Sequence, residues 1–284
     1  FDFGPDVLEK FIRDYSLTQP PYLSANLDFS NEPGLQNLVD NGRIRKSTVV
    51  NLNGTYVGVV GLTTPMLDYI SSPRNVIVND DLVTIAQGQI DSLLNLGLNK
   101  IILISHLQSI KEDSILISQL RHVDIAIAGG GDELLTNDPS IALPGMDIYG
   151  NYPLEYEDAD GNTVYVVTTP GEYTYVGHLM AEFDVNGNVV SIDPASNPVL
   201  VTNTTPDEEL VELVEEPVTA YVANLAQNII ATTEVTLDGV KNNVRTLETN
   251  EGDLVADATL WQATQLAPAF GVNLPDVAFQ NGGG

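Results

Sequence analysis

Apolar and polar residues in the first hundred positions alternate with the periods of strands and then of a helix. Residues 47–64 alternate and then run apolar on either side of Asn53-Gly54, which predicts a hairpin that leads into a buried strand. Residues 81–97 carry apolar side chains at helical spacing. This part of the chain therefore predicts strands and a helix in close succession.

Two further apolar runs end in polar tips. Residues 100–109 are an apolar run that ends at Ser105-His106, and residues 123–135 end in a glycine-rich segment. Both patterns are typical of buried strands. Sites in open α/β sheets lie at the carboxyl ends of such strands, so we expect functional residues at these two tips.

The pattern changes to alternation beyond Leu154. Residues 162–193 predict a β-meander, with turns at 158–162 (DADGN) and 184–188 (DVNGN). Both turns resemble the start of a calcium loop, but the bidentate Glu that such a loop needs downstream is missing. Hairpin turns are the better interpretation.

A long helix is predicted over 205–230. Thr205 is a suitable cap, Pro206 fits the first helical position, and acidic residues fill the first turn. Pro217 is expected to kink the helix. Because a new pattern starts behind it, the helix is interpreted as a connector.

The last part of the chain predicts a strand, a helix and a closing strand. These are residues 233–239, the capped helix 252–267, and residues 276–284, which end in three glycines. A domain that stops on a strand is expected to continue, so we expect this one to be cut short.

Composition narrows the classes of partner. The 284 residues include 39 acidic and 11 basic side chains, giving a formal charge of −28, and 43% are hydrophobic. Such a surface lacks the basic footprint of a nucleic-acid binder and is repelled by an anionic membrane. No apolar run is long enough for a membrane helix, and the absence of cysteine excludes disulfides and thiolate metal sites.

Several local strings occur in the same order as in one known family. They are residues 1–8 (FDFGPDVL), 22–29 (YLSANLDF), 54–65 (GTYVGVVGLTTP), 102–109 (ILISHLQS), 123–135 (VDIAIAGGGDELL), 244–261 (VRTLETNEGDLVADATLW) and 281–284 (NGGG). On these strings the chain resembles the 5'-nucleotidase family, which combines a calcineurin-like metallophosphoesterase domain with a C-terminal nucleotide-holding domain.

The resemblance implies an α/β (α+β) fold with three parts. Residues 1–203 would form a four-layer α/β/β/α metallophosphoesterase sandwich that lacks its N-terminal part. Residues 204–231 would be the connector helix, and 232–284 the start of the smaller α/β substrate-binding domain. It also implies truncation at both ends: the metal-ligand motifs that precede the Phe-Asp-x-Gly string, and the base-stacking residues that follow NGGG, would lie outside the chain.

Two residues match catalytic positions of the family. His106, at the end of a buried strand, matches a His that ligates the second ion of a two-metal centre; the alternative is a structural histidine. Asp2 matches an acid that orients a catalytic His, and the alternative is a cap for a helix that starts near Pro5.

The segment 129–133 departs from the family. Where relatives carry Gly-His-x-His, this chain places Gly130 and Asp132, so one ligand is lost. Asp132 could still bind a metal, and a carboxylate favours harder ions such as Ca, Mg, Mn or Fe over Zn. The expected cofactors are therefore divalent metal ions, in two sites in the family, with a decayed centre as the alternative.

Residues near the C-terminus match the family's substrate contacts. Arg245 could clamp a phosphate or carboxylate, or form an ion pair with Glu248. Asn281, Gly282 and Gly283 would let the backbone approach the ligand, or would only form a turn. Glu248, Asn250 and Asp257 are expected to support this loop and cap the following helix.

The other two histidines, His122 and His178, have no matching role in the family. Each lies at the start or middle of a strand pattern, and both are interpreted as surface or core residues.

Three functions remain open on the sequence. The first is a metal-dependent hydrolase of 5'-nucleotides or related phosphomonoesters, extracellular, periplasmic or at the cell surface, of which this chain alone is expected to be inactive. The second is a non-catalytic surface or structural relative with a degenerate metal centre. The third is an unrelated solute-binding protein with two lobes. Oligomeric state is left open by the sequence.

Overall fold

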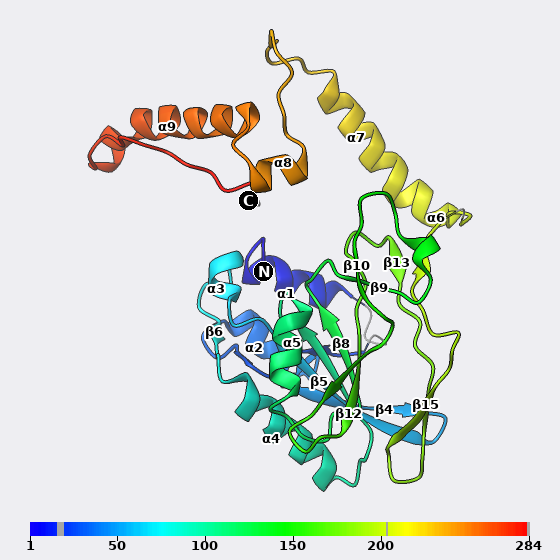
Figure 1. Cartoon of the computed structure of the whole chain (residues 1–284). Helices are drawn as coiled ribbons and strands as arrows, with labels where there is room; N and C mark the ends of the chain where they lie inside the picture. Colours follow the sequence, from blue (N-terminus) through cyan, green and yellow to red (C-terminus); the bar gives the residue numbers. More distant parts are fainter. Residues whose placement is uncertain (16–19, 203, 283–284) are drawn as a thin grey trace. The chain divides into compact units, whose positions relative to one another are not determined.

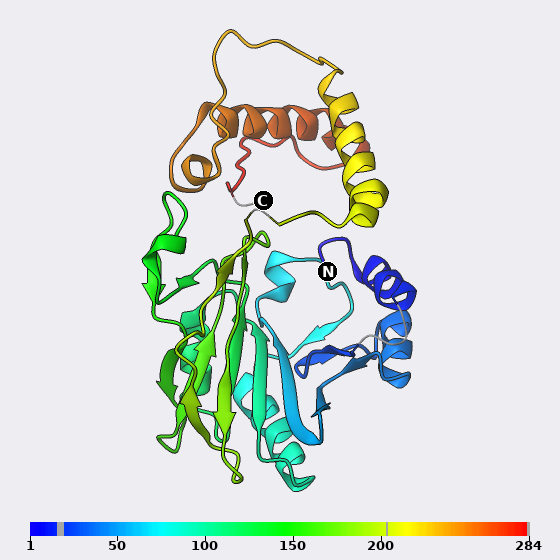
Figure 2. The ribbon, with the colours of Figure 1, turned by 90° about the vertical axis from the view of Figure 1, so that its right-hand side faces the viewer.

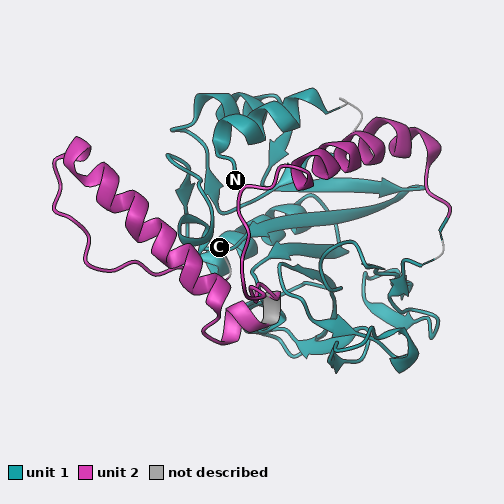
Figure 3. Ribbon diagram, turned by 90° about the horizontal axis from the view of Figure 1, so that it is seen from above, with its two compact units in different colours: residues 1–204 teal, residues 205–284 magenta. Residues whose placement is uncertain are grey.

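The protein divides into two compact units in the computed structural model, which describes residues 1–15, 20–202 and 204–282. Unit 1 comprises Phe1–Thr204 and unit 2 comprises Thr205–Gly284 (Figure 3). Each unit is described by itself below.

A six-stranded sheet forms the centre of unit 1 (Figure 1). Across the sheet the strands are β11 (Leu154–Glu157), β12 (Thr163–Val167), β8 (Ile125–Gly129), β7 (Ile101–His106), β5 (Thr55–Thr63) and β4 (Ser47–Leu52). The middle four are parallel, and the two edge strands pair antiparallel with their neighbours. The predicted hairpin at Asn53-Gly54 is confirmed as the β4–β5 connection.

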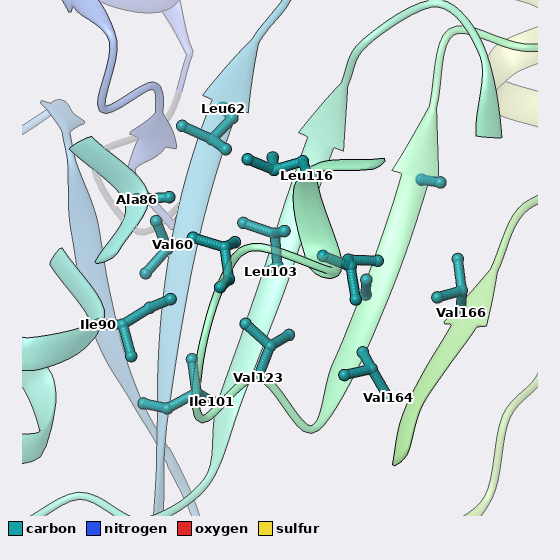
Figure 4. Packing of buried hydrophobic residues seen from close by; sticks show 14 of the residues in the cluster. Val60, Leu62, Ala86, Ile90, Ile101, Leu103, Leu116, Val123, Val164 and Val166 are labelled. Carbon is teal, nitrogen blue, oxygen red and sulfur yellow. The ribbon is translucent and has the colours of Figure 1, made fainter. Parts of the chain in front are cut away.

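Two helices cover one face of this sheet. They are α4 (Leu82–Asn95) and α5 (Ile110–Ile117), and the predicted helix at 81–97 is thus confirmed. Asp81 caps α4 by accepting a hydrogen bond from the Thr84 amide at 3.2 Å. Alternate residues of the strands pack against the helices in a continuous core (Figure 4). Within it, Ile101 and Leu103 of β7 are at most 1% exposed.

A second, smaller core lies at the N-terminal side of unit 1. Helices α1 (Pro5–Asp14) and α2 (Pro33–Asp40) pack side by side there (Figure 2). Ile12, Leu35 and Leu38 are buried between them and the short strands. The remaining elements of this region are β1 (Tyr22–Leu23), β2 (Leu27–Asp28), β3 (Ile44–Arg45), α3 (Leu67–Ile70) and β6 (Ile77–Val78).

The meander predicted over 162–193 is wrong as a single unit. Its first strand, β12, joins the central sheet beside β8, because Val164 and Val166 complete the buried face. The rest forms two-stranded pairs. The remaining elements before residue 204 are β9 (Leu134–Leu135), the 3₁₀ turn Pro139–Ile141, β10 (Ile148–Gly150), β13 (Tyr175–Val176), β14 (Ala181–Phe183), β15 (Val189–Ile192) and β16 (Val199–Leu200).

Both Asp-initiated turns are hairpin connections, as predicted. Asp158 joins β11 to β12, and its Oδ1 accepts hydrogen bonds from the amides of Asp160 and Asn162, both at 2.9 Å. Asp184 makes the same pattern between β14 and β15. The side-chain oxygens of both aspartates thus accept hydrogen bonds from backbone amides of their own turns.

Unit 2 consists of helices in the part of the chain that the structure describes. They are α6 (Glu208–Leu210), a π-helical turn (Val211–Glu215), α7 (Glu216–Ala226), α8 (Lys241–Thr246) and α9 (Asn250–Phe270). Asp207 caps α6 by accepting from two amides, so the expected cap at Thr205 is wrong and Pro206 precedes the helix. Pro217 is the second residue of α7, two positions beyond the π-helical turn, and its missing N–H cannot donate to a carbonyl oxygen of that turn.

The strands predicted at 233–239 and 276–284 are wrong as far as the structure describes them. Neither segment pairs with a neighbour, and Gly283 and Gly284 lie outside the described residues. A strand needs a neighbouring strand to bond its backbone N–H and C=O groups. An alternating pattern of apolar and polar residues does not show whether such a neighbour exists. The predicted helix 252–267 is confirmed within α9, capped by the Thr249 hydroxyl, which accepts from the Gly252 amide at 3.2 Å.

The expected α/β fold class is confirmed. Of the expected layers, unit 1 contains a helical layer and the six-stranded sheet, and on the opposite face the segment around Leu179 reaches the central core. Short strand pairs stand where a continuous second sheet was expected. The structure has no helix in its described part long and apolar enough to cross a bilayer.

Leu103 tests the central core. We expect Leu103→Ala to lower the free energy of unfolding by about 2–5 kcal/mol, because it leaves a cavity between β7 and the helices. Urea denaturation is the measurement. Leu96→Ala is the control, because Leu96 is 74% exposed and its truncation should change stability by less than about 0.5 kcal/mol. Equal effects of the two substitutions would contradict this description of the core.

Candidate functional site

The carboxyl ends of three parallel strands bring the candidate residues to one edge of the sheet. In the register of β5, β7 and β8, Thr63 lies beside His106, and His106 beside Gly129. The Thr64 amide donates to the His106 carbonyl oxygen at 2.9 Å and extends this pairing by one residue. The edge predicted from the two polar tips therefore exists.

His106 projects from the face of the sheet opposite to α4 and α5. Side chains alternate along a strand, and Ile101, Leu103 and Ser105 of β7 are buried on the helix side. The His106 side chain is exposed and lies over a glycine backbone: an ideal Cβ on Gly129 would be 3.4 Å from its Nδ1. The imidazole is thus open to a ligand on one side and supported by backbone on the other.

Gly130 is required by conformation and by space. Its φ is +91°, and a Cβ there would lie 2.9 Å from the Gln108 amide nitrogen and 3.0 Å from His106 Cδ2. Any larger side chain at this position, including the histidine that the family pattern predicts, would therefore need Gln108 or His106 to move. The local backbone therefore favours glycine at position 130, and the loss of a metal ligand there stays a prediction.

Asp132 lies on an exposed loop. Its Oδ1 accepts a long hydrogen bond from the Gly171 amide, at 3.4 Å. Within residues 1–282, apart from the gaps at 16–19 and 203, no three His, Asp or Glu side chains come together in a way that could hold a metal ion. His106 and Asp132 are too few donors for the expected two-metal centre, so the residues present do not fit one by themselves.

The hydrogen-bond partner of Asp2 is not one of the strand-end residues. The Asp2 carboxylate accepts a hydrogen bond from the Ser71 hydroxyl at 2.9 Å. The alternative role as a helix cap is wrong, because the cap position of α1 is Gly4 and no side chain caps it. An orienting role for Asp2 stays a prediction.

A buried polar cluster behind His106 was not anticipated from the sequence. Asp113 of α5 is fully buried and accepts a short hydrogen bond from the Ser105 hydroxyl. Glu133, on the loop after β8, accepts from the Ile110 amide at the start of α5, at 3.2 Å. A signal existed: Asp113 occupies the apolar face of α5, three residues after Ile110 and three before Leu116, where an unpaired charge is costly.

The environment of Asp113 favours its neutral form. Burial raises the pKa of Asp113 to about 7; the hydrogen bond from Ser105 opposes the shift, and the charges of Glu112 and Glu133 add to it. Oδ2 of Asp113 and Oε2 of Glu133 are buried without a hydrogen-bond partner. A proton on Asp113 removes the cost of burying its charge.

Unit 2 brings two of its candidate segments together. A Cβ on Gly282 would lie 2.9 Å from the Arg245 amide nitrogen, so the backbone at Gly282 approaches α8 closely. Asn281 and Gly282 also line a cavity of about 490 Å³ with the first turn of α9. Glu248, Glu251 and Asp253 make this cavity acidic. Gly283 lies outside the described residues.

The supporting residues of this loop act in different ways. Asn250 accepts from the Asp238 amide at 2.8 Å and donates to the Thr236 carbonyl oxygen at 2.9 Å, which ties the loop to the start of α9. Thr249 provides the helix cap. The Arg245 side chain is exposed, and no ion pair joins it to Glu248 in the described part of unit 2.

His122 and His178 both have exposed side chains, as expected for surface residues. The His122 amide donates to Asp158 Oδ2 at 3.2 Å, and the His178 carbonyl oxygen accepts from the Asn197 amide at 3.0 Å. These backbone contacts explain both positions structurally.

Gly130→Ala is expected to destabilise the protein by about 2–4 kcal/mol, because it adds strain at positive φ to a clash with backbone. Gly145→Ala is the matched control: φ there is +86° and nothing lies within 4 Å of the added Cβ. It should cost only about 1 kcal/mol. Thermal and urea unfolding measure both, and similar losses would show that no close contact exists at Gly130.

The raised pKa of Asp113 predicts a pH-dependent stability. Between its ordinary value of 3.8 and about 7 the unfolded chain loses this proton while the folded chain keeps it. The unfolded state then binds fewer protons at this group, so the contribution of Asp113 to stability is most favourable below pH 3.8 and falls as pH rises toward 7. Asp113→Asn should remove this fall, gaining about 2–3 kcal/mol on wild type between about pH 5 and pH 7.

Urea unfolding of both proteins across this pH range is the measurement. Glu112→Gln is the control: it removes an exposed charge that only adds to the raised pKa of Asp113, so the fall in stability with pH should become smaller but should remain. Parallel pH profiles for wild type and Asp113→Asn would contradict the shift.

Comparison with known proteins places these features in context. No protein-family model matches the chain. The 5'-nucleotidases of Mus musculus and Homo sapiens are each 29% identical to it over 287 aligned positions, which cover 100% of this chain and 48% of theirs. The chain thus spans about half the length of the curated relatives it matches.

Solved structures give the same result. The crystal structure of the 5'-nucleotidase precursor from Thermus thermophilus superposes with a TM-score of 0.76 at 31% identity, over 95% of this chain and 50% of that one. The Haemophilus influenzae NAD nucleotidase shares the fold, with a TM-score of 0.63 and 23% identity over 82% of this chain and 51% of that one. The resemblance indicated by the ordered motifs is therefore confirmed: the chain is similar along nearly its whole length to about half of each of these 5'-nucleotidases.

Proposed function

We propose that the protein hydrolyses phosphomonoesters of the 5'-nucleotide type. The observation that carries the proposal is its similarity along the whole chain to 5'-nucleotidases, together with an exposed His106 at the strand-end edge. Because the chain spans about half of these relatives, the activity is assigned to the protein in which all the necessary groups come together.

His106 is the residue of unit 1 that we assign to the reacting end of the substrate. Its imidazole is exposed and supported by Gly129 and Gly130, so it can coordinate a cation or donate to a phosphate oxygen. Divalent metal ions are part of the proposal. The described residues supply too few ligand side chains to hold a metal ion by themselves, so we assign no chemical step to a metal.

The organic part of the substrate is assigned to unit 2. The cavity beside Asn281 and Gly282 has the size of a small-molecule site. Its acidic lining disfavours a phosphate there and suits the uncharged sugar and base. Arg245 and Gly283 belong to the same proposed contact region. The proposed division of the chain is a metallophosphoesterase-like domain (1–203), a connector (204–231) and the start of a substrate-binding domain (232–284).

The proposed location is extracellular, periplasmic or at the cell surface. With a formal charge of −28 the protein would repel nucleic acid, so a small nucleotide or related phosphomonoester is the proposed partner. Asp2 is proposed to orient a catalytic group rather than to touch the substrate.

A second candidate is a relative without catalysis. It is favoured by the backbone at 130, where glycine replaces a ligand and a larger residue does not fit. Such a protein would retain the fold for binding or for a structural role. The metal content of the purified protein separates the two candidates: bound metal ions favour the hydrolase, and their absence favours the relative without catalysis.

The test is release of phosphate from AMP and from a generic phosphomonoester, with and without a chelator, and with Mn²⁺, Mg²⁺ or Zn²⁺ restored. The protein assayed is the one in which this chain is joined by the other groups that the proposal needs. If the proposal is correct, that protein is active in its wild-type form, the chelator abolishes its activity, and His106→Ala lowers its kcat/KM at least about a hundredfold.

His122→Asn is the control for this assay. His122 is exposed and precedes β8, at the amino ends of the strands rather than at the edge that carries His106. Its φ is 62°, a conformation that asparagine adopts readily, so the substitution should leave kcat/KM within about twofold.

The opposite result has a clear meaning. A folded protein that binds no metal and releases no phosphate under any of these conditions would support the non-catalytic relative. Full activity in His106→Ala would remove the assigned role of this histidine.

A further inference from the structure

Ser105 and His106 are consecutive residues of β7 whose side chains lie on opposite faces of the sheet. Ser105 is 8% exposed and lies on the side covered by the helices, whereas His106 is exposed on the other side. Because successive side chains of a strand share one rigid backbone, a contact that holds Ser105 also sets the direction of His106.

Asp113 provides that contact. It is fully buried in α5, and its Oδ1 accepts the Ser105 hydroxyl proton in a short hydrogen bond. The Ser105 hydroxyl also lies 3.4 Å from the Ile127 carbonyl oxygen of the neighbouring strand. The helix, β7 and β8 therefore meet at this one hydroxyl.

Glu133 connects the loop that follows β8, residues 129–133, to the same helix. Its Oε1 accepts from the Ile110 amide at the start of α5, and its carboxylate fills the space beside Gly131, where a Cβ would lie 1.9 Å from Oε2. Residues 129–133, including the glycines under His106, are thus anchored to the element that carries Asp113.

We propose that Asp113 is a positioning residue for His106, holding the carboxyl end of β7 through Ser105 so that the imidazole stays over Gly129 and Gly130. The part that His106 plays in hydrolysis rests on the proposed function, whereas its positioning does not. No activity, ligand or metal is needed for this arrangement.

The burial of a carboxyl group here needs a reason, because an apolar residue would pack on the same helix face at lower cost. Charged and titratable groups face Asp113 from each packed element: Glu112 on its own helix, Glu133 on the loop after β8, and Tyr156 on β11. None of them is a cation, so Asp113 is not retained for an ion pair. Its hydrogen bond to Ser105 is the interaction that an apolar replacement would lose.

The test is NMR of the imidazole groups in the full chain without added metal or substrate. The protein has three histidines, so the Cδ2 and Cε1 signals can be assigned with His122→Asn and His178→Ala. The variants are Asp113→Ala, Asp113→Asn and Ser105→Ala. Glu112→Gln is the matched control, because it removes an exposed carboxylate from the adjacent position.

We expect Asp113→Ala and Ser105→Ala to move the His106 signals toward those of free histidine, with those of His122 and His178 unchanged. Asp113→Asn retains an acceptor for Ser105 and should shift His106 less, and Glu112→Gln should not shift it. Unchanged His106 signals in a folded Asp113→Ala or Ser105→Ala protein would overturn the proposal, even if its melting temperature fell.

If Asp113→Ala does not fold, Ser105→Ala decides by the same criterion, because it removes only the hydroxyl. If the wild-type protein releases no phosphate, the proposed function is overturned, but the NMR result on the position of His106 still stands. The two inferences therefore fail separately.

Discussion

The parallel register of β5, β7 and β8 is the constraint on which the rest of unit 1 depends. It aligns Thr63, His106 and Gly129 in one row and thereby places two loops far apart in sequence at a common edge. The register holds because alternate side chains of each strand are buried under α4 and α5. A slip by one residue would turn every buried side chain to the other face.

The same alternation divides the edge into a chemical side and a supporting side. His106 is exposed on one face, while Ser105 and Asp113 are buried on the other. Such an arrangement lets the protein hold a polar group at the surface with contacts that solvent does not reach. The cost is a carboxyl group in the core, whose pKa burial raises to about 7.

Unit 2 is organised differently. Its helices expose large apolar side chains, among them Trp261 at 63% and Phe270 at 74%, and Ala267 is the one buried hydrophobic residue in its described part. Its order comes instead from local capping, by Asp207 on α6 and by Thr249 on α9. Local hydrogen bonds thus define helices here without a core of their own.

Sequence alone determined the elements whose signals are local. These are the hairpin at Asn53-Gly54, the helices around 81–97 and 252–267, the two Asp-initiated turns, and the strand that ends at His106. Tertiary structure decided what depends on distant partners. It placed β12 in the central sheet, left 233–239 without a strand, set Gly130 against His106, and buried Asp113 behind Ser105. Periodicity reports which residues one element buries, whereas pairing and close contact require the neighbour to be known.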